Sequence, residues 1–162
     1  WNLSGVFERY FPSLQRQSAL ITLHGFFEHE LTALCNLCQK DRAYKLGVGD
    51  LKGAGVERAV TYLERVVGLE IDRSGALWAE IKSIQTLRNL LVHNAGKLTH
   101  QDGTPRAAEQ QYVEKCRFLL AEDGEEVVIL EGYLGHVLNT FSQFFEHVGQ
   151  AINQLYGVRP AL

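Results

Sequence analysis

Apolar residues recur at intervals of three and four along most of this 162-residue chain, and this is the period of a helix with one buried face. Polar and glycine-rich stretches interrupt the pattern at several points. The pattern predicts helices over residues 14–39, 56–67, 76–94 and 132–156.

Local signals support these boundaries. Pro12 and Ser13 stand just before the first helix as start signals, and Ser74 is a suitable N-cap for the helix over 76–94. Gly68 and Gly96 suit the left-handed residue that often closes a helix. The expected buried stripe of the first helix is Leu20, Leu23, Phe27, Leu31, Leu34 and Leu37. The expected stripe of the last helix is Leu134, Val137, Leu138, Phe141, Phe145, Val148, Ile152 and Leu155.

The connecting segments are less regular. Residues 46–55 are rich in glycine but lack the context of a dinucleotide or phosphate-binding loop, so they are interpreted as a connector. Residues 97–108 are polar and are expected to form a loop. Residues 110–131 fit either a helical stripe or a short helix or extended lead-in followed by a β-hairpin. Because Asp123-Gly124 separates two β-prone runs, the hairpin is favoured.

Composition places the chain among ordinary globular proteins. It is 46% hydrophobic and 22% charged, and its net charge of −3 gives no general attraction to nucleic acid or to an anionic membrane. Three cysteines favour a reducing, cytoplasmic setting over a disulfide scaffold. No apolar run approaches the roughly 18 residues that span a bilayer. Because the sequence starts at Trp1 and contains no methionine, we expect the natural start to lie upstream.

Arg88 has an unusual position in the predicted helix 76–94. On an ideal helix of roughly 100° per residue, Arg88 falls in the middle of the apolar arc formed by Leu77, Ile81, Ile84, Leu91 and Val92. A guanidinium on a buried face is costly unless it is paired, so Arg88 is either an ion-pair partner or a functional group. His93 lies roughly 140° around the same helix. The two side chains would converge if the helix frays near Asn94, or if a second subunit supplies its own pair.

The segment from Arg88 to His93 resembles the signature of the HEPN superfamily (higher eukaryotes and prokaryotes nucleotide-binding). Here Arg88 is followed by the polar Asn89, by three apolar residues and by His93, and then by Asn94-Ala95-Gly96, near the end of a late helix. The resemblance implies a mostly α fold, an antiparallel helical bundle over residues 1–162 as a single domain. A small β-hairpin before the last helix would be an addition to that bundle.

Many proteins with this pattern are metal-independent endoribonucleases that act as toxins or in antiviral defence, which implies catalysis without any cofactor. His93 would exchange a proton with the ribose 2′-hydroxyl or the leaving 5′-oxygen. Arg88 would hold the scissile phosphate, and Asn89 would orient the phosphate or the imidazole. Substrate-binding candidates of lower rank are Asn94, Lys97 and Lys82, and Arg106 is a further candidate for a basic rim around Arg88.

The expected partners are an RNA substrate, a second copy of the chain and, for a toxin, an antitoxin or defence-system protein; no membrane is expected. A two-fold homodimer would join two Arg88–His93 sets in one cleft. The alternative is a non-catalytic dimerisation or nucleotide-binding module on the same fold. An ion pair that seals Arg88 to an acid such as Glu80 or Glu64 would favour that module.

Two other groups of residues have side chains suited to metal binding or redox chemistry. Cys35 and Cys38 form a Cys-x-x-Cys inside a helical pattern; they are expected to be small core residues rather than a redox or zinc site, because no partner pair accompanies them. His24, Glu28 and His29 lack the spacing that places two histidines on one face for a metal. Solvated or capping roles are expected for them.

Overall fold

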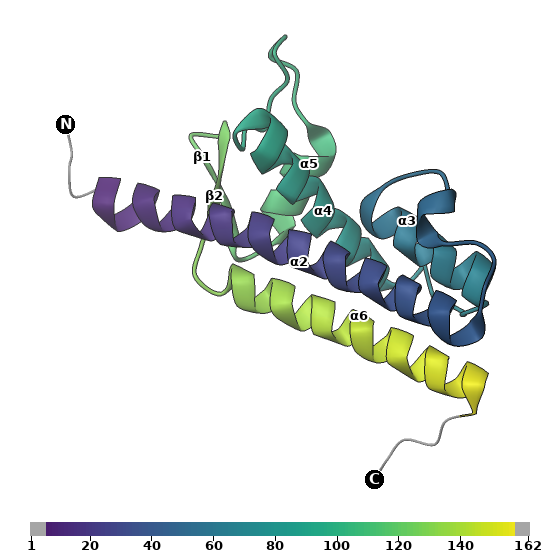
Figure 1. Ribbon diagram of the computed structural model, residues 1–162. Coiled ribbons are helices and arrows are strands. Elements are labelled where there is room, and N and C mark those ends of the chain that lie inside the picture. The colour runs from purple at the N-terminus through teal and green to yellow at the C-terminus, as the bar shows by residue number, and fades with distance from the viewer. Residues whose placement is uncertain (1–5, 158–162) are drawn as a thin grey trace. The chain divides into compact units, whose positions relative to one another are not determined.

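The computed structural model describes residues 6–157, and most of them are helical (Figure 1). The helices are α2 (Phe11–Arg42), α3 (Gly55–Tyr62), α4 (Ala76–Asn94), α5 (Ala107–Lys115) and α6 (Tyr133–Tyr156). Short π-helical turns lie at Val6–Tyr10 and Leu63–Val67, and a 3-10 turn lies at Val48–Asp50. Strands β1 (Leu119–Glu122) and β2 (Glu126–Ile129) form an antiparallel hairpin. The mostly α prediction is confirmed. Within the described residues, no helix is both long and apolar enough to cross a membrane.

The predicted helix boundaries hold, with two corrections at N-termini. Helix α2 begins at Phe11, directly after the π-helical turn Val6–Tyr10, so Pro12 and Ser13 lie within continuous helix and not before it. Ser74 is not the N-cap of α4. Its hydroxyl donates to Asp72 Oδ1 at 2.7 Å, and the helix begins at Ala76.

The region that was ambiguous in the sequence contains both a helix and a hairpin. Helix α5 takes up its first part, and β1 and β2 pair with Leu119 opposite Ile129. Asp123 and Gly124 have φ values of 50° and 74°, and the Glu125 N–H donates to the Glu122 carbonyl at 2.9 Å. These left-handed dihedrals are what a tight hairpin turn needs, and Asp-Gly accepts them readily.

The chain groups into two compact units. The first combines the chain up to His24 with Ala79–Thr140, and the second combines Gly25–Trp78 with the chain from Phe141 onward. The first unit thus holds the hairpin, α5 and most of α4. Its buried core includes Leu20, Ile81, Ile84, Leu98, Leu119, Val127, Ile129 and Val137.

Side chains of α2 fix the hairpin within the first unit. Ser13 Oγ accepts the Ile129 N–H at 3.2 Å, and Arg16 Nη1 donates to the Ile129 carbonyl at 3.2 Å. Gln17 Nε2 donates to the Val127 carbonyl at 3.4 Å. The outer edge of β2 therefore has hydrogen-bond partners outside the sheet. These bonds stabilise the hairpin, since a two-stranded hairpin alone is only marginally stable.

Aromatic packing dominates the second unit. The rings of Phe27 and Phe141 stack with centroids 3.9 Å apart, and Phe144 meets Phe27 edge-on. Just beyond the end of α2 and at the last residue of α6, the hydroxyls of Tyr44 and Tyr156 lie 3.3 Å apart. Because both pairs advance in the same sense along α2 and α6, these helices run parallel in this unit (Figure 1). The antiparallel arrangement expected of the bundle does not extend to this pair.

The buried face of α2 is turned by about one position from the predicted stripe. The buried residues are Leu20, His24, Phe27, Leu31, Cys35 and Cys38, whereas Leu37 is 63% exposed. The predicted stripe was wrong where a histidine or a cysteine is buried in place of the neighbouring leucine. In α6, Val137, Phe141 and Val148 are buried as predicted, but Leu138 and Leu155 are exposed.

Candidate active site

The C-terminal end of α4 carries the Arg88–His93 segment and is held in place by the hairpin. The helix is regular to Asn94, and Ala95 and Gly96 then take φ values of 50° and 78°. The Gly96 carbonyl accepts the Val127 N–H at 3.0 Å. The helix does not fray before His93, so the fraying route to convergence is excluded.

Arg88 is half-buried on the inner side of this helix, as its place in the apolar arc predicted. Its neighbours Ile84, Leu87 and Leu91 are buried, whereas Val92 is 41% exposed. Arg88 Nη1 donates to Asn89 Oδ1 at 3.0 Å. Its Nε is buried and has no hydrogen-bond partner in residues 6–157. Within that range the guanidinium also has no carboxylate within ion-pair distance.

His24 is the residue near Arg88 that the sequence interpretation missed. It is buried in the face of α2 described above, so the solvated role expected for it is wrong. Burial, and after it the Arg88 charge, lowers the pKa of His24 to about 4. Arg88 therefore has a neutral imidazole nearby at pH 7. The signal was present in the sequence, because His24 stands in helical register with Leu20, Phe27 and Leu31.

His93 and Asn89 are exposed on the outer side of α4, and Val92 lies on the same side. On a regular helix the His93 and Arg88 side chains remain roughly 140° apart. A single copy of the chain therefore presents the two groups in different directions.

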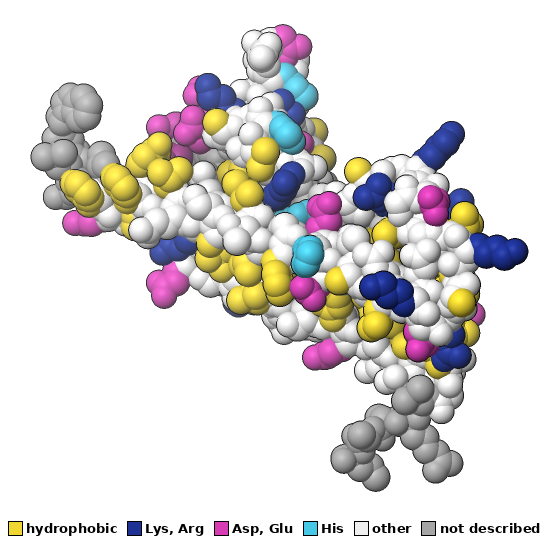
Figure 2. Space-filling model, in the orientation of Figure 1, with side chains coloured by type: hydrophobic (Ala, Val, Ile, Leu, Met, Phe, Trp, Pro, Cys, Tyr) yellow, Lys and Arg dark blue, Asp and Glu magenta, His cyan; other side chains and the backbone are white. Residues whose placement is uncertain are grey.

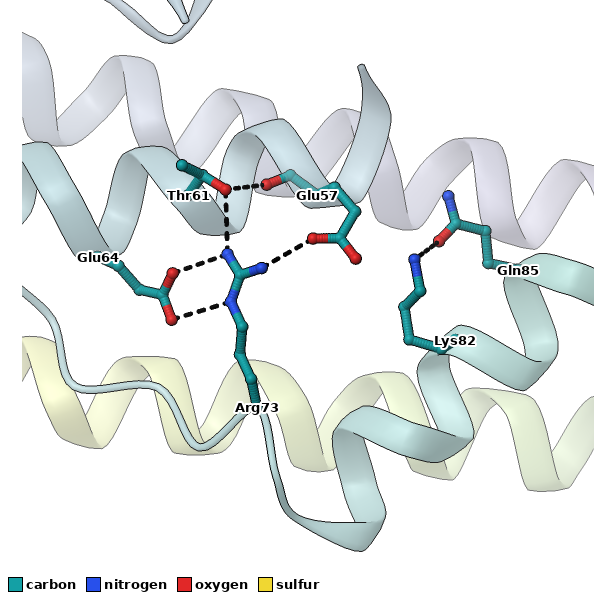
Figure 3. Close-up of polar contacts among 6 residues, drawn as sticks. All are labelled: Glu57, Thr61, Glu64, Arg73, Lys82 and Gln85. Atoms are coloured by element: carbon teal, nitrogen blue, oxygen red, sulfur yellow. Dashed lines mark hydrogen bonds and ion pairs between the residues drawn. The ribbon is translucent and has the colours of Figure 1, made fainter. Parts of the chain in front are cut away.

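The lower-ranked binding candidates are only partly brought together. Asn94 Oδ1 accepts Arg106 Nη2 at 2.8 Å, which places one basic residue at the end of α4. Lys97 is exposed just beyond the helix. Lys82 donates to Gln85 Oε1 at 3.1 Å on its own helix (Figure 3). It lies roughly 120° around α4 from Arg88, so it does not extend the same face.

The two acids considered as partners of Arg88 belong to other clusters. In the second unit, Glu64 binds Arg73, with Oε2 at 2.7 Å from Nη2 (Figure 3). Arg73 also contacts Glu57 at 2.8 Å and donates to Thr61 Oγ1 at 3.0 Å. Arg73, not Arg88, is thus the arginine in a structural ion-pair cluster.

Glu80 belongs to a second polar cluster, in the first unit. Its Oε1 accepts the Tyr112 hydroxyl at 2.6 Å and lies 2.7 Å from His136 Nε2, and the Tyr112 and Tyr133 hydroxyls are 3.0 Å apart. Burial, above all, raises the pKa of both tyrosines, which keeps their hydroxyls protonated as donors. No sequence spacing indicated this cluster, because its members come from α4, α5 and α6.

Cys35 and Cys38 are buried, as predicted for core residues, and are unbonded to each other. Burial raises the pKa of the Cys35 thiol to about 12, so it is a weak nucleophile. In the described part of the chain, no group of three or more His, Cys, Asp or Glu side chains is placed to hold a metal ion.

Comparison of the chain with known protein families, with characterised proteins and with solved structures found no match. The arguments about function therefore depend on the geometry and chemistry of the residues themselves.

Proposed function

We propose that the chain is a metal-independent endoribonuclease whose active site forms between two copies. The observation that carries the proposal is Arg88, a half-buried guanidinium with a buried Nε and no acidic partner in residues 6–157. Partial burial of an unpaired charge is unfavourable, so such a group is suited to bind an anion. The hydrogen bond from Nη1 to Asn89 would hold the planar guanidinium in a fixed orientation for a phosphate.

The residues fit cleavage by the ribose 2′-hydroxyl. The 2′-oxygen bonds to the adjacent phosphorus, and the bond from phosphorus to the 5′-oxygen breaks. His93 of one copy would take the 2′ proton, and His93 of the partner subunit would give a proton to the 5′-oxygen. Arg88 would stabilise the charge on the non-bridging oxygens. The products are a 2′,3′-cyclic phosphate and a 5′-hydroxyl.

A two-fold dimer is proposed because one copy does not join the two groups. Asn89, Val92 and His93 form an exposed face at the end of α4, and Val92 provides an apolar contact at its centre. Packing this face against its own copy is self-complementary, and the Arg88 guanidinium reaches the edge of the face through its bond to Asn89, so His93 of one chain would approach Arg88 of the other at that edge.

The resemblance to toxin and defence ribonucleases extends the proposal to the cell. We propose that expression arrests growth by cutting cytoplasmic RNA, and that an antitoxin or defence-system protein restrains the activity. His93→Ala should abolish the arrest without lowering the level of the protein.

Cleavage of a fluorescent mixed-sequence RNA, with and without EDTA, tests the proposed activity. His93→Ala should lower the rate by about 100- to 10,000-fold. Arg88→Ala should cost on the order of 3–4 kcal/mol in transition-state stabilisation. Arg88→Lys should not restore the rate fully, because the single ammonium group of lysine cannot make the paired hydrogen bonds of a guanidinium. The same oligonucleotide made of DNA should be inert.

Matched controls separate the site from a general loss of charge. His100→Ala and Arg65→Ala change the same residue types at exposed positions away from α4 and should cleave at the wild-type rate. Wild-type protein that is inactive on varied RNA, or equal activity in the His93 and His100 variants, would refute the nuclease. Inactivity combined with a dimer lost on Val92→Asp would support the non-catalytic dimerisation module instead.

A further inference from the structure

The first unit contains a groove that the proposed reaction does not use. Its volume is about 710 Å³, and it lies between the first turns of α2, the hairpin and the end of α4. That size is within the range of pockets that bind ligands or peptide side chains. Polar contacts from Ser13, Arg16 and Gln17 hold the hairpin against α2 as described above, so the groove has fixed walls.

The walls of the groove carry apolar side chains that remain exposed. Tyr10 is 58% exposed, Leu14 is 43% exposed and Leu120 is 54% exposed. In the hairpin, Leu120 and Val128 pair across the strands on the groove face, whereas Leu119 and Ile129 face the core. Figure 2 shows hydrophobic side chains gathered over the N-terminal end of α2, with acidic side chains beside them. Clustered exposed apolar groups of this kind commonly mark an interaction surface.

The charge around the groove is acidic. Glu8, Glu122, Glu126 and Glu131 line it and are exposed. Among the lining residues whose side chains the structure describes, a set that leaves out Arg9, Arg16 is the one cation, and its Nη1 donates to a backbone carbonyl. Among the described lining side chains the four carboxylates outnumber Arg16, and such an excess repels phosphate groups and attracts lysine and arginine. The groove is therefore unsuited to RNA or to an anionic lipid surface.

We propose that this groove binds an amphipathic, basic helical segment of a partner protein. Apolar side chains of that segment, spaced at i, i+3 or i+4, and i+7, would lie on Leu14, Leu120 and Val128. Lysine or arginine residues along its edges would face Glu122 and Glu131. The groove also includes Leu91 and Ala95 of the segment that ends α4, but the binding does not depend on the proposed ribonuclease activity.

The test uses synthetic peptides of about 16 residues, a length that gives a helix of roughly four turns. The probe is a fluorescent Leu/Lys peptide with one apolar face; a scrambled Leu/Lys peptide and a Leu/Glu peptide are its controls. Fluorescence anisotropy should show binding of the probe to the wild-type chain and not of either control peptide. Chemical-shift changes on addition of the probe should be largest in the hairpin amides.

Matched variants locate the binding. Glu122→Lys/Glu131→Lys should weaken binding by about tenfold or more, because it reverses charges that would contact the peptide. Glu114→Lys/Glu146→Lys makes the same change in net charge at exposed sites outside the groove and should alter the dissociation constant less than about twofold. Leu14→Ser should also weaken binding, since Leu14 is exposed and its loss should leave the fold intact.

Three outcomes would overturn the proposal. One is equal binding of the ordered and scrambled Leu/Lys peptides, which would mean non-specific attraction. Another is an equal loss of affinity in the two charge-reversal variants. The third is a wild-type dimer that Leu14→Ser dissociates, which would make a second copy the occupant of the groove.

Discussion

Arg88→Met, compared with Arg73→Met, tests whether Arg88 is free to act on a substrate. Both changes remove a guanidinium and keep an unbranched apolar chain of similar length. Among the described residues, Arg88 has one hydrogen bond, to the exposed Asn89, and a buried Nε without a partner. Arg73 has two carboxylate partners and a hydroxyl partner, and its guanidinium lies 5.2 Å from the centroid of the Trp78 ring.

The opposite surroundings give opposite expected effects on the free energy of unfolding. A buried polar group left unsatisfied costs about 1–3 kcal/mol, so its removal in Arg88→Met should leave stability unchanged or raise it by about 1 kcal/mol. Arg73→Met removes the ion-pair partner of Glu64 and one partner of Glu57, and should lower stability by about 1–3 kcal/mol, toward the lower end because all three side chains are partly exposed. The two variants should therefore differ by about 1–4 kcal/mol, with about 2 kcal/mol as the central value.

Urea denaturation followed by circular dichroism measures the difference, with the m-value checked for each variant. In thermal melts, the same difference should separate the two midpoints by roughly 4–8 °C for a chain of this length. A loss of about 2 kcal/mol or more in Arg88→Met would refute the reasoning, because it would reveal a structural partner for Arg88.

Two further predictions concern the buried polar groups. His24 has a folded pKa of about 4 and an unfolded pKa near 6.5, so the unfolded chain binds more protons between these values. The free energy of unfolding should therefore fall by up to about 3 kcal/mol as the pH drops from 6.5 to 4. In urea titrations at several pH values, His24→Leu should flatten that decline. An unchanged dependence of stability on pH in this variant would contradict the low pKa of His24. Tyr112→Phe should lower stability by about 1–3 kcal/mol, because it removes the donor to Glu80, whereas Tyr10→Phe at an exposed position should have little effect. Equal stability of the two tyrosine variants would show that the Glu80 cluster is not structural.

Local features were predictable from the sequence because they depend on neighbours in the chain. The bounds of α4 follow from an apolar period and from glycine at a left-handed position. The Asp123-Gly124 turn follows from the dihedrals that a tight hairpin needs. The half-buried position of Arg88 was also readable, since helical geometry alone places it in the apolar arc.

What the sequence by itself could not determine is which groups meet across long separations. The predicted stripe of α2 was one position off at Leu23, Leu34 and Leu37, because only packing shows that His24 and the cysteines are buried there. The sequence left Glu80 as a candidate partner of Arg88, but in the folded chain Glu80 contacts His136 and Tyr112. The acidic groove likewise depends on the docking of the hairpin against α2. Side-chain pairing between distant elements is set by the tertiary arrangement, which helical periodicity does not specify.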